Sequence, residues 1–125
     1  MRLVDLNPRW FGAGGEGIYN SDMTPAEERR GIGISFDCPC NKCREMKAKA
    51  DKDDWPVGRH FIMFTNPIDG KPTWKSRPDD PTWNRVGDTF DTLQLSPSIL
   101  SDPSKGGCSW HGYIGLSIPG EVTTC

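Results

Sequence analysis

The sequence predicts an α+β domain that is mostly β, with a small antiparallel sheet made of short strands and long loops. Glycine and proline carry much of this prediction, because 14 Gly and 11 Pro make up one residue in five of 125, against about 12% in average proteins. Such residues interrupt helices and favour turns. Only 34% of the residues are hydrophobic, so a cross-link or a bound metal would add much to the stability of this chain.

Apolar and polar residues alternate in several short segments, which is the pattern of half-buried strands. The clearest is Ile32, Ile34 and Phe36, alternating with Gly33, Ser35 and Asp37. Further segments with strand character are 59–65, 89–95, an edge segment at 96–100 that contains Pro97, and a terminal hairpin of 110–117 with 121–124. A loop rich in Pro, Trp and Asp is expected at 71–88.

The length fits a single domain, 1–125. Residues 1–30 are expected to form an irregular arm, because they contain a turn dipeptide at Asn7-Pro8 and four glycines between 12 and 17. Within the arm, residues 24–30 carry an N-cap, a following Pro and acidic residues, which predicts one short helix. Residues 41–56 read as a polar, solvated insert that is helical or mobile.

The charge balance argues against several function classes. The formal net charge is −2, which gives no strong field toward nucleic acid or an anionic membrane. No apolar run approaches the roughly 18 residues of a membrane span, and the first residues do not resemble a secretory signal. We therefore expect a protein that is not secreted by a signal peptide and that works in the cytoplasm in which it is made, or in a particle assembled there.

Five cysteines are the strongest chemical signal, because clustered cysteines in a reducing compartment usually bind metal or do redox chemistry. Cys38, Cys40 and Cys43 lie in one short segment, and Cys108 forms a Cys-x-x-His motif with His111. Thiolates together with an imidazole form a closed tetrahedral set suited to zinc. The sequence thus predicts one structural zinc ion in a zinc-ribbon-like site, with Cys38, Cys40, Cys43, Cys108 and His111 as candidate ligands.

The choice of ligands within the first segment stays open at this stage. Cys40 with Cys43 is the preferred pair, and Cys38 with Cys40 is an alternative. Cys125 either completes the site or has no part in it. In either case the ion would join two distant halves of the chain, and closing so large a loop removes much entropy from the unfolded state.

Three other functions are less favoured by the sequence. Cys108-x-x-His111-Gly112 matches half of a Rieske iron–sulfur motif, but such a centre needs two Cys and two His, and the slot of the first His holds Cys40. Catalysis is also less favoured, because neither His60 nor His111 is followed two residues later by an acid, as zinc deaminases require. A nucleic-acid module would use four basic residues that stand beside acidic ones: Arg44, Lys47, Lys49 and Lys52.

An ordered set of motifs resembles a family of small uncharacterised proteins of tailed bacteriophages and prophages. The motifs cover most of the chain: 7–10 (NPRW), 36–40 (FDCPC), 66–70 (NPIDG), 87–93 (GDTFDTL), 95–99 (LSPSI) and 107–112 (GCSWHG). The resemblance implies a phage context and a cysteine/histidine metal site. Family members read Cys-Pro-Cys-Gly-Cys in the first cluster, whereas this chain reads Cys-Pro-Cys-Asn-Lys-Cys, so Cys38 and Cys40 carry over more directly than Cys43.

Together these observations predict a non-enzymatic, zinc-stabilised bacteriophage accessory protein that binds another macromolecule. Its partner would be a phage structural protein, with this chain a head or decoration component of the virion, or a host protein that it modulates. Nucleic acid and membrane are not expected as partners, and the sequence says nothing about oligomeric state. The alternatives are a Rieske-like redox protein and a nucleic-acid-binding zinc module.

Overall fold

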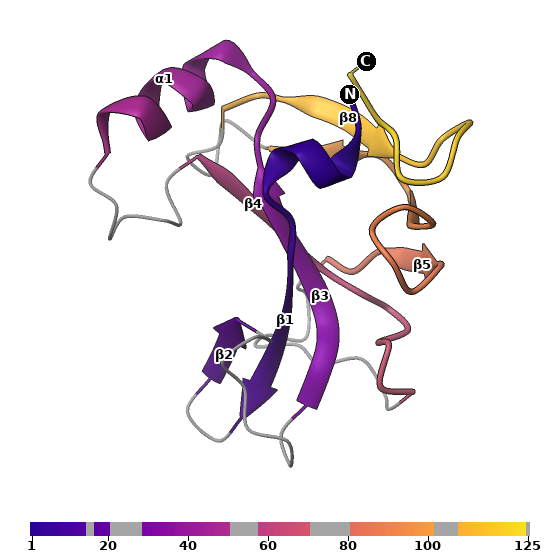
Figure 1. Ribbon diagram of the computed structural model, residues 1–125. Helices are drawn as coiled ribbons and strands as arrows, with labels where there is room; N and C mark the ends of the chain where they lie inside the picture. The colour runs from indigo at the N-terminus through magenta and orange to yellow at the C-terminus, as the bar shows by residue number, and fades with distance from the viewer. Residues whose placement is uncertain (15–16, 21–28, 51–57, 71–80, 102–107, 125) are drawn as a thin grey trace.

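The computed structural model describes residues 1–14, 17–20, 29–50, 58–70, 81–101 and 108–124. These residues form a mostly β fold with three small antiparallel sheets and one α-helix, which confirms the predicted fold class. Figure 1 shows the long strand β3 (Arg29–Asp37) running through the molecule, with β2 near one of its ends and the helix α1 (Asn41–Lys49) beyond the other.

The largest sheet has four strands in the order β2-β1-β3-β4. Its other members are β1 (Arg9–Gly14), β2 (Gly17–Asn20) and β4 (Arg59–Met63), and all three pairings are antiparallel. Strand β3, which the alternation of Ile32, Ile34 and Phe36 predicts, occupies an inner position in the sheet. In the pairing of β3 with β4, Phe36 lies opposite His60 and Ile34 opposite Ile62.

Two smaller sheets complete the fold. Strand β5 (Asn84–Val86) pairs with β6 (Gln94–Ser96), and β8 (His111–Ile114) pairs with both β7 (Ile99–Leu100) and β9 (Val122–Thr124). The β8–β9 hairpin is the one predicted from the sequence. The first residue lies beside β9, because the Val122 N–H donates to the Met1 carbonyl at 2.7 Å and the Met1 amino group contacts Glu121 at 2.8 Å.

One apolar core joins the sheets. Its side chains come from both the first residues of the chain and the terminal hairpin, and they are almost completely inaccessible: Leu3, Ile34, Phe36, Phe64, Leu93, Ile99 and Ile114. Burial of this kind is the main stabilising term of a small domain. The core lies between the inner face of β3–β4 and the smaller sheets, so it fixes the position of the end of β3, from which the chain continues to Cys38.

The first thirty residues differ from the irregular arm predicted for them. They contain a 3-10 helix (Leu3–Leu6) and the strands β1 and β2. Gly12 and Gly14, which suggested loops, lie in β1, and Gly17 begins β2. The close packing of β1 on β3 uses a glycine outside the arm, because a Cβ atom at Gly33 would lie 2.2 Å from Cζ of Phe11, on the neighbouring strand. Of the predicted helix at 24–30, residues 24–28 lie outside the described residues, while Arg29 and Arg30 belong to β3.

Two further segments depart from the predictions. Of the strand predicted at 89–95, only Gln94 and Leu95 lie in one, as part of β6. Thr89–Thr92 form a turn in which the Thr92 N–H donates to the Thr89 carbonyl at 3.2 Å and the two hydroxyls lie 2.7 Å apart. Local side-chain hydrogen bonds of this kind compete with strand pairing. The expected loop at 71–88 contains β5 in its described part. Within the 41–56 insert, the described part forms α1 up to Lys49.

Candidate metal centre

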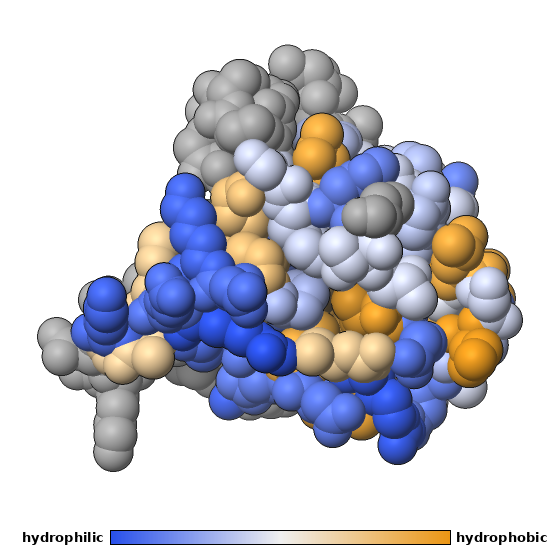
Figure 2. All heavy atoms as spheres, turned by 90° about the horizontal axis from the view of Figure 1, so that it is seen from above, coloured by the Kyte–Doolittle hydropathy of each residue, from blue (hydrophilic) through white to orange (hydrophobic). Residues whose placement is uncertain are grey.

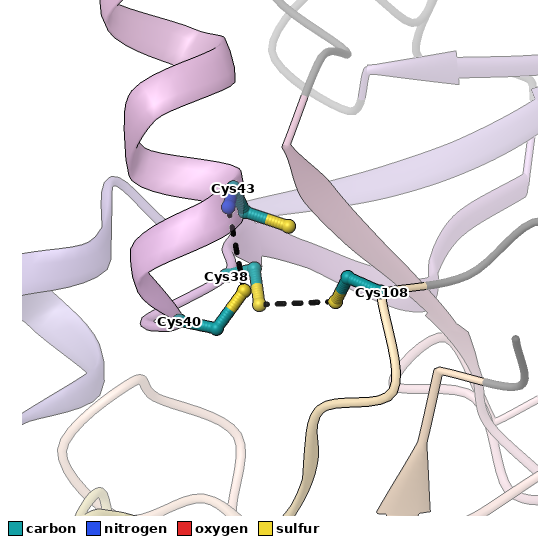
Figure 3. A group of neighbouring side chains, drawn as sticks. All are labelled: Cys38, Cys40, Cys43 and Cys108. Carbon is teal, nitrogen blue, oxygen red and sulfur yellow. Dashed lines mark hydrogen bonds between the residues drawn. The ribbon is translucent and has the colours of Figure 1, made fainter.

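Four cysteine thiols from two distant segments meet at the end of β3. The Sγ atoms of Cys38, Cys40, Cys43 and Cys108 all lie within 4.8 Å of one another, and Figure 3 shows the four side chains converging. Cys38 follows β3, Cys40 and Cys43 belong to the start of α1, and Cys108 precedes β8. None of the four forms a disulfide.

The first three thiols are positioned by the turn from β3 into α1. The Cys38 N–H donates to the Gly58 carbonyl at 2.8 Å, which extends the pairing of β3 with the chain before β4. Cys40 is the N-cap of α1, and its sulfur accepts the Cys43 N–H at 3.3 Å. Gly58 has φ +72°, and a Cβ there would lie 2.9 Å from the Cys43 carbonyl oxygen, so this approach requires glycine.

Cys108 is held by a short connection to the residue that follows β7. Its N–H donates to the Ser101 hydroxyl at 3.1 Å, and the next N–H, that of Ser109, donates to the Ser101 carbonyl at 2.9 Å. Ser109 has φ +71°, a left-handed conformation that turns the chain sharply before β8. The Cys108 sulfur consequently lies 3.7 Å from that of Cys38.

Burial and hydrogen bonding give the thiols different pKa values. Cys38 and Cys43 are buried, and burial raises the pKa of Cys38 far above its ordinary value and that of Cys43 to about 12. At Cys108 burial also acts to raise the pKa, but hydrogen bonds from the Trp110 backbone, Ser101 and the neighbouring thiols outweigh it and lower the pKa to about 7. Without a cation, therefore, Cys38 and Cys43 keep their protons, and a bound metal ion would have to displace them.

The distances between the sulfurs suit one ion rather than a multinuclear cluster. With metal–sulfur bonds of about 2.3 Å, the sulfurs of a tetrahedral site lie about 3.8 Å apart, close to the 3.7 Å between Cys38 and Cys108. Thiolates that bind different irons of an iron–sulfur cluster are farther apart than ligands of a single ion. The site can therefore hold a single thiophilic ion with four sulfur ligands.

His111, the fifth candidate ligand, is not part of this group. Its Nε2 lies 2.8 Å from the Ser98 hydroxyl, and its ring is close to that of Tyr113. Strand β8 begins at His111, which pairs with Leu100, so the pleat of the sheet sets the direction of the imidazole. The Cys-x-x-His spacing would bring both side chains to one site only if the turn at Cys108 continued through residue 111.

The sequence leaves open which two of Cys38, Cys40 and Cys43 would bind the ion. The structure brings the sulfurs of all three into the group. Cys43 belongs to it although its position departs from the Cys-Pro-Cys-Gly-Cys spacing. The helical turn from Cys40 to Cys43 explains this, because residues three apart on a helix lie on the same face. Cys125 lies outside the described residues.

The second histidine also lies apart from the thiols. His60 is buried on β4, with its ring 5.2 Å from that of Phe36 and 5.0 Å from that of Trp110, and its Nε2 has no hydrogen-bond partner among the described residues. Burial lowers its pKa to about 4. Neither histidine therefore stands with the thiols as a Rieske centre would require.

Comparison with known proteins found no matching family model, no matching curated protein and no matching solved structure. Within the described part of the chain, no helix has the length and apolar character needed to cross a membrane. The fold and the site thus define the protein by class: a small, mostly β domain with a cluster of four cysteines that could hold a metal ion.

Proposed function

We propose that Cys38, Cys40, Cys43 and Cys108 bind one structural zinc ion that joins the two halves of the domain. The observation that carries this proposal is the convergence of four thiols within 4.8 Å. Zinc is the divalent ion that most often takes four sulfur ligands in tetrahedral structural sites. Four protein ligands leave no open position for a substrate or a catalytic water, which supports a structural rather than a catalytic role.

The way α1 is attached supports the same role. Cys43 is the only buried residue among the nine of α1, and Lys47 of the helix forms an ion pair with Asp37 of β3 at 3.1 Å. Partly exposed ion pairs add little stability. A zinc ion bound to Cys40 and Cys43 would anchor the first turn of α1 to β3 and to the segment before β8.

A test of the site measures metal content by elemental analysis. The wild-type protein should contain one zinc per chain and be colourless, whereas iron bound by the same thiols would give visible absorbance. Cys108→Ser should lose most of the zinc, and His111→Ala is the matched control that should keep it. Equal zinc content in wild type and Cys108→Ser, or loss of zinc in His111→Ala, would contradict the proposed ligand set.

For the protein as a whole, we propose a non-enzymatic bacteriophage accessory role in which the zinc-stabilised domain binds another protein. The resemblance to phage proteins supports the context. Exposed apolar side chains support a binding role, since Val86, Leu116 and Ile118 are each about 60% exposed. Figure 2 shows apolar residues interrupting a largely hydrophilic face. Clusters of exposed apolar side chains are typical of protein-binding surfaces.

The described contacts give less support to nucleic-acid binding. Of the four basic residues considered for it, Lys47 is paired with Asp37, and Arg44 lies 3.8 Å from the Met1 sulfur. Lys52 is outside the described residues. A mobility-shift assay at low salt should show no binding, because phosphate contacts would be strongest there.

The partner can be sought by quantitative mass spectrometry of purified virions. A fixed copy number per particle would identify a head or decoration component. Absence from virions, with recovery of one host protein after cross-linking in infected cells, would identify a host-directed role. Absence of both would contradict a macromolecular-binding role.

A further inference from the structure

The four thiols form two pairs of different kinds. Cys40 and Cys43 belong to one turn, where the sulfur of the first accepts the N–H of the second at 3.3 Å. Cys38 and Cys108 are 70 residues apart in the chain, yet their sulfurs lie 3.7 Å from each other. Figure 3 shows this sulfur–sulfur contact between the two segments. The two pairs would therefore give different products on oxidation.

We propose that oxidation by a peroxide joins Cys38 to Cys108 in a disulfide, so that the metal leaves while the two segments stay covalently linked. This inference rests on the proposed zinc site for the release of the ion, although formation of the disulfide depends only on the thiol geometry. The sulfurs need to approach by less than 2 Å, from 3.7 Å to the disulfide bond length of about 2.0 Å.

The reaction proceeds in two balanced steps with hydrogen peroxide as the oxidant. The Cys108 thiolate, which is less buried than Cys38, attacks one peroxide oxygen; an S–O bond forms, the O–O bond breaks and hydroxide leaves. The Cys38 sulfur, as thiolate, then attacks the sulfenic sulfur; the S–S bond forms and the hydroxyl leaves as hydroxide. Two protons convert the hydroxides to water. The sulfurs lose two electrons and the peroxide gains them.

Metal release follows from the loss of two ligands. A disulfide sulfur no longer carries the charge that binds zinc, and Cys40 and Cys43 alone give two thiolates where a structural site uses four ligands. The disulfide itself links the two segments. The backbone hydrogen bonds of Cys38 N–H to Gly58 and of Cys108 N–H to Ser101 do not involve the sulfurs, so the reaction does not break them. Oxidation therefore exchanges a metal cross-link for a covalent one and leaves the turn at Cys40 and Cys43 free.

Peptide mapping of the full-length protein tests this pairing. The protein is treated with hydrogen peroxide, free thiols are blocked with iodoacetamide, and trypsin is added without reduction. Trypsin cuts after Lys42 and Lys105, so Cys43 is separated from the peptide 31–42, and Cys108 falls in the peptide 106–125. The expected product is a cross-link between these two peptides. Fragmentation at the Cys38–Pro39 bond then assigns it to Cys38 or Cys40.

A colorimetric zinc chelator followed in the same reaction reports metal release. We expect one equivalent of zinc to appear together with the cross-linked peptide, and reduction with dithiothreitol to restore binding. A disulfide between Cys40 and Cys43, or over-oxidation of Cys108 to the sulfinic acid without a cross-link, would overturn the proposal. A protein that contains no zinc but forms the Cys38–Cys108 cross-link would instead contradict the proposed zinc site and keep the thiol pairing.

Two variants sharpen the assignment. Cys125→Ser is the matched control, because Cys125 shares the tryptic peptide of Cys108; this variant should form the cross-link in the same yield as wild type. Cys38→Ser should lose it. If the cross-link disappears in Cys125→Ser, the pairing is wrong, and this result is independent of whether Cys38→Ser folds.

Discussion

Strand β3 and helix α1 follow each other in the chain, but different interactions hold each of them in the fold. Within β3, Ile34 and Phe36 are completely buried in the apolar core. Beyond Cys38, α1 buries only Cys43, and its other described contacts include the partly exposed Lys47–Asp37 ion pair and the approach of Arg44 to the Met1 sulfur. Apolar burial and strand pairing on both sides stabilise the first region, whereas the second has too little apolar area to hold a nine-residue helix in place.

This difference shows what a metal ion would add to the molecule. An ion bound by the four thiols would act on α1 and on the segment before β8, and it would add little to the sheet that the core already stabilises. Changes in the core should therefore act with or without metal, and changes at the thiols should act only on the metal-bound protein. The four predictions below test that separation.

The largest effect is expected from Phe36→Ala, which should reduce the free energy of unfolding by about 3–5 kcal/mol because it leaves a cavity in the core. The loss should be the same in zinc and in chelator, and urea denaturation under both conditions measures it. Phe61→Ala on the neighbouring strand is the control, since this ring is 46% exposed and should cost much less. A loss at Phe36 that vanishes without zinc would contradict the separation.

The next effect is a dependence of stability on pH that His60 produces. Its pKa is about 4 in the folded protein and about 6.5 when unfolded, so between these values the unfolded chain binds the extra proton. The contribution of neutral His60 to the free energy of unfolding is complete above pH 6.5. It falls by about 3 kcal/mol as the pH is lowered toward 4. Denaturation curves of wild type and His60→Phe at several pH values isolate this loss.

His60→Phe is the reference protein for this measurement, because release of the metal in acid affects both proteins equally. The difference in unfolding free energy between them should grow steadily as the pH falls from 6.5 to 4. A constant difference over that range would show that the imidazole of His60 is not buried in its neutral form.

Removal of zinc should have a smaller and localised effect. With free zinc at 100 times its Kd, binding adds about 2.7 kcal/mol to the folded state. On addition of a chelator, hydrogen exchange should show a larger loss of protection at the amides of α1 than at those of β3, because β3 loses only this global stabilisation whereas α1 also loses its anchor. Equal loss in both elements would show that the metal stabilises the whole fold.

The smallest effect is expected from Ser101→Ala. The Ser101 hydroxyl accepts the Cys108 N–H and hydrogen-bonds its sulfur, and loss of such a neighbour weakens metal sites by about 10-fold or more. Competition with a chelator of known affinity measures this change. Ser98→Ala is the control, since Ser98 contacts His111 and no thiol of the group in the contacts described. A similar loss in both variants would argue for a general structural effect.

The sequence predicts the parts of the fold that depend on regular apolar patterns. The strand through Ile32 and Phe36 and the terminal hairpin follow from alternation, and both are present. The arm is different because its glycines Gly12, Gly14 and Gly17 lie in paired strands rather than in turns. The Thr89–Thr92 turn also escapes prediction, because its alternation is overridden by hydrogen bonds between its own side chains.

For the candidate site, spacing in sequence predicts which segments meet but not which atoms. Four of the five candidate ligands come together, since the cysteines follow a strand end and a helix start that fix their directions. His111 lies apart, because the first residue of β8 takes its orientation from a strand pairing that local spacing does not reveal. The Ser101 contact with Cys108 likewise depends on the fold, as seven residues separate the two.

The small apolar area that attaches α1 to the rest of the fold has a consequence for recognition by a partner. If the zinc ion determines whether α1 stays packed on the rest of the fold, the chain has two conformations. Their proportions depend on the concentration of free zinc. A binding protein that touches the helix would then meet its target only in well-supplied cells, whereas one that touches the sheet would be indifferent to the supply.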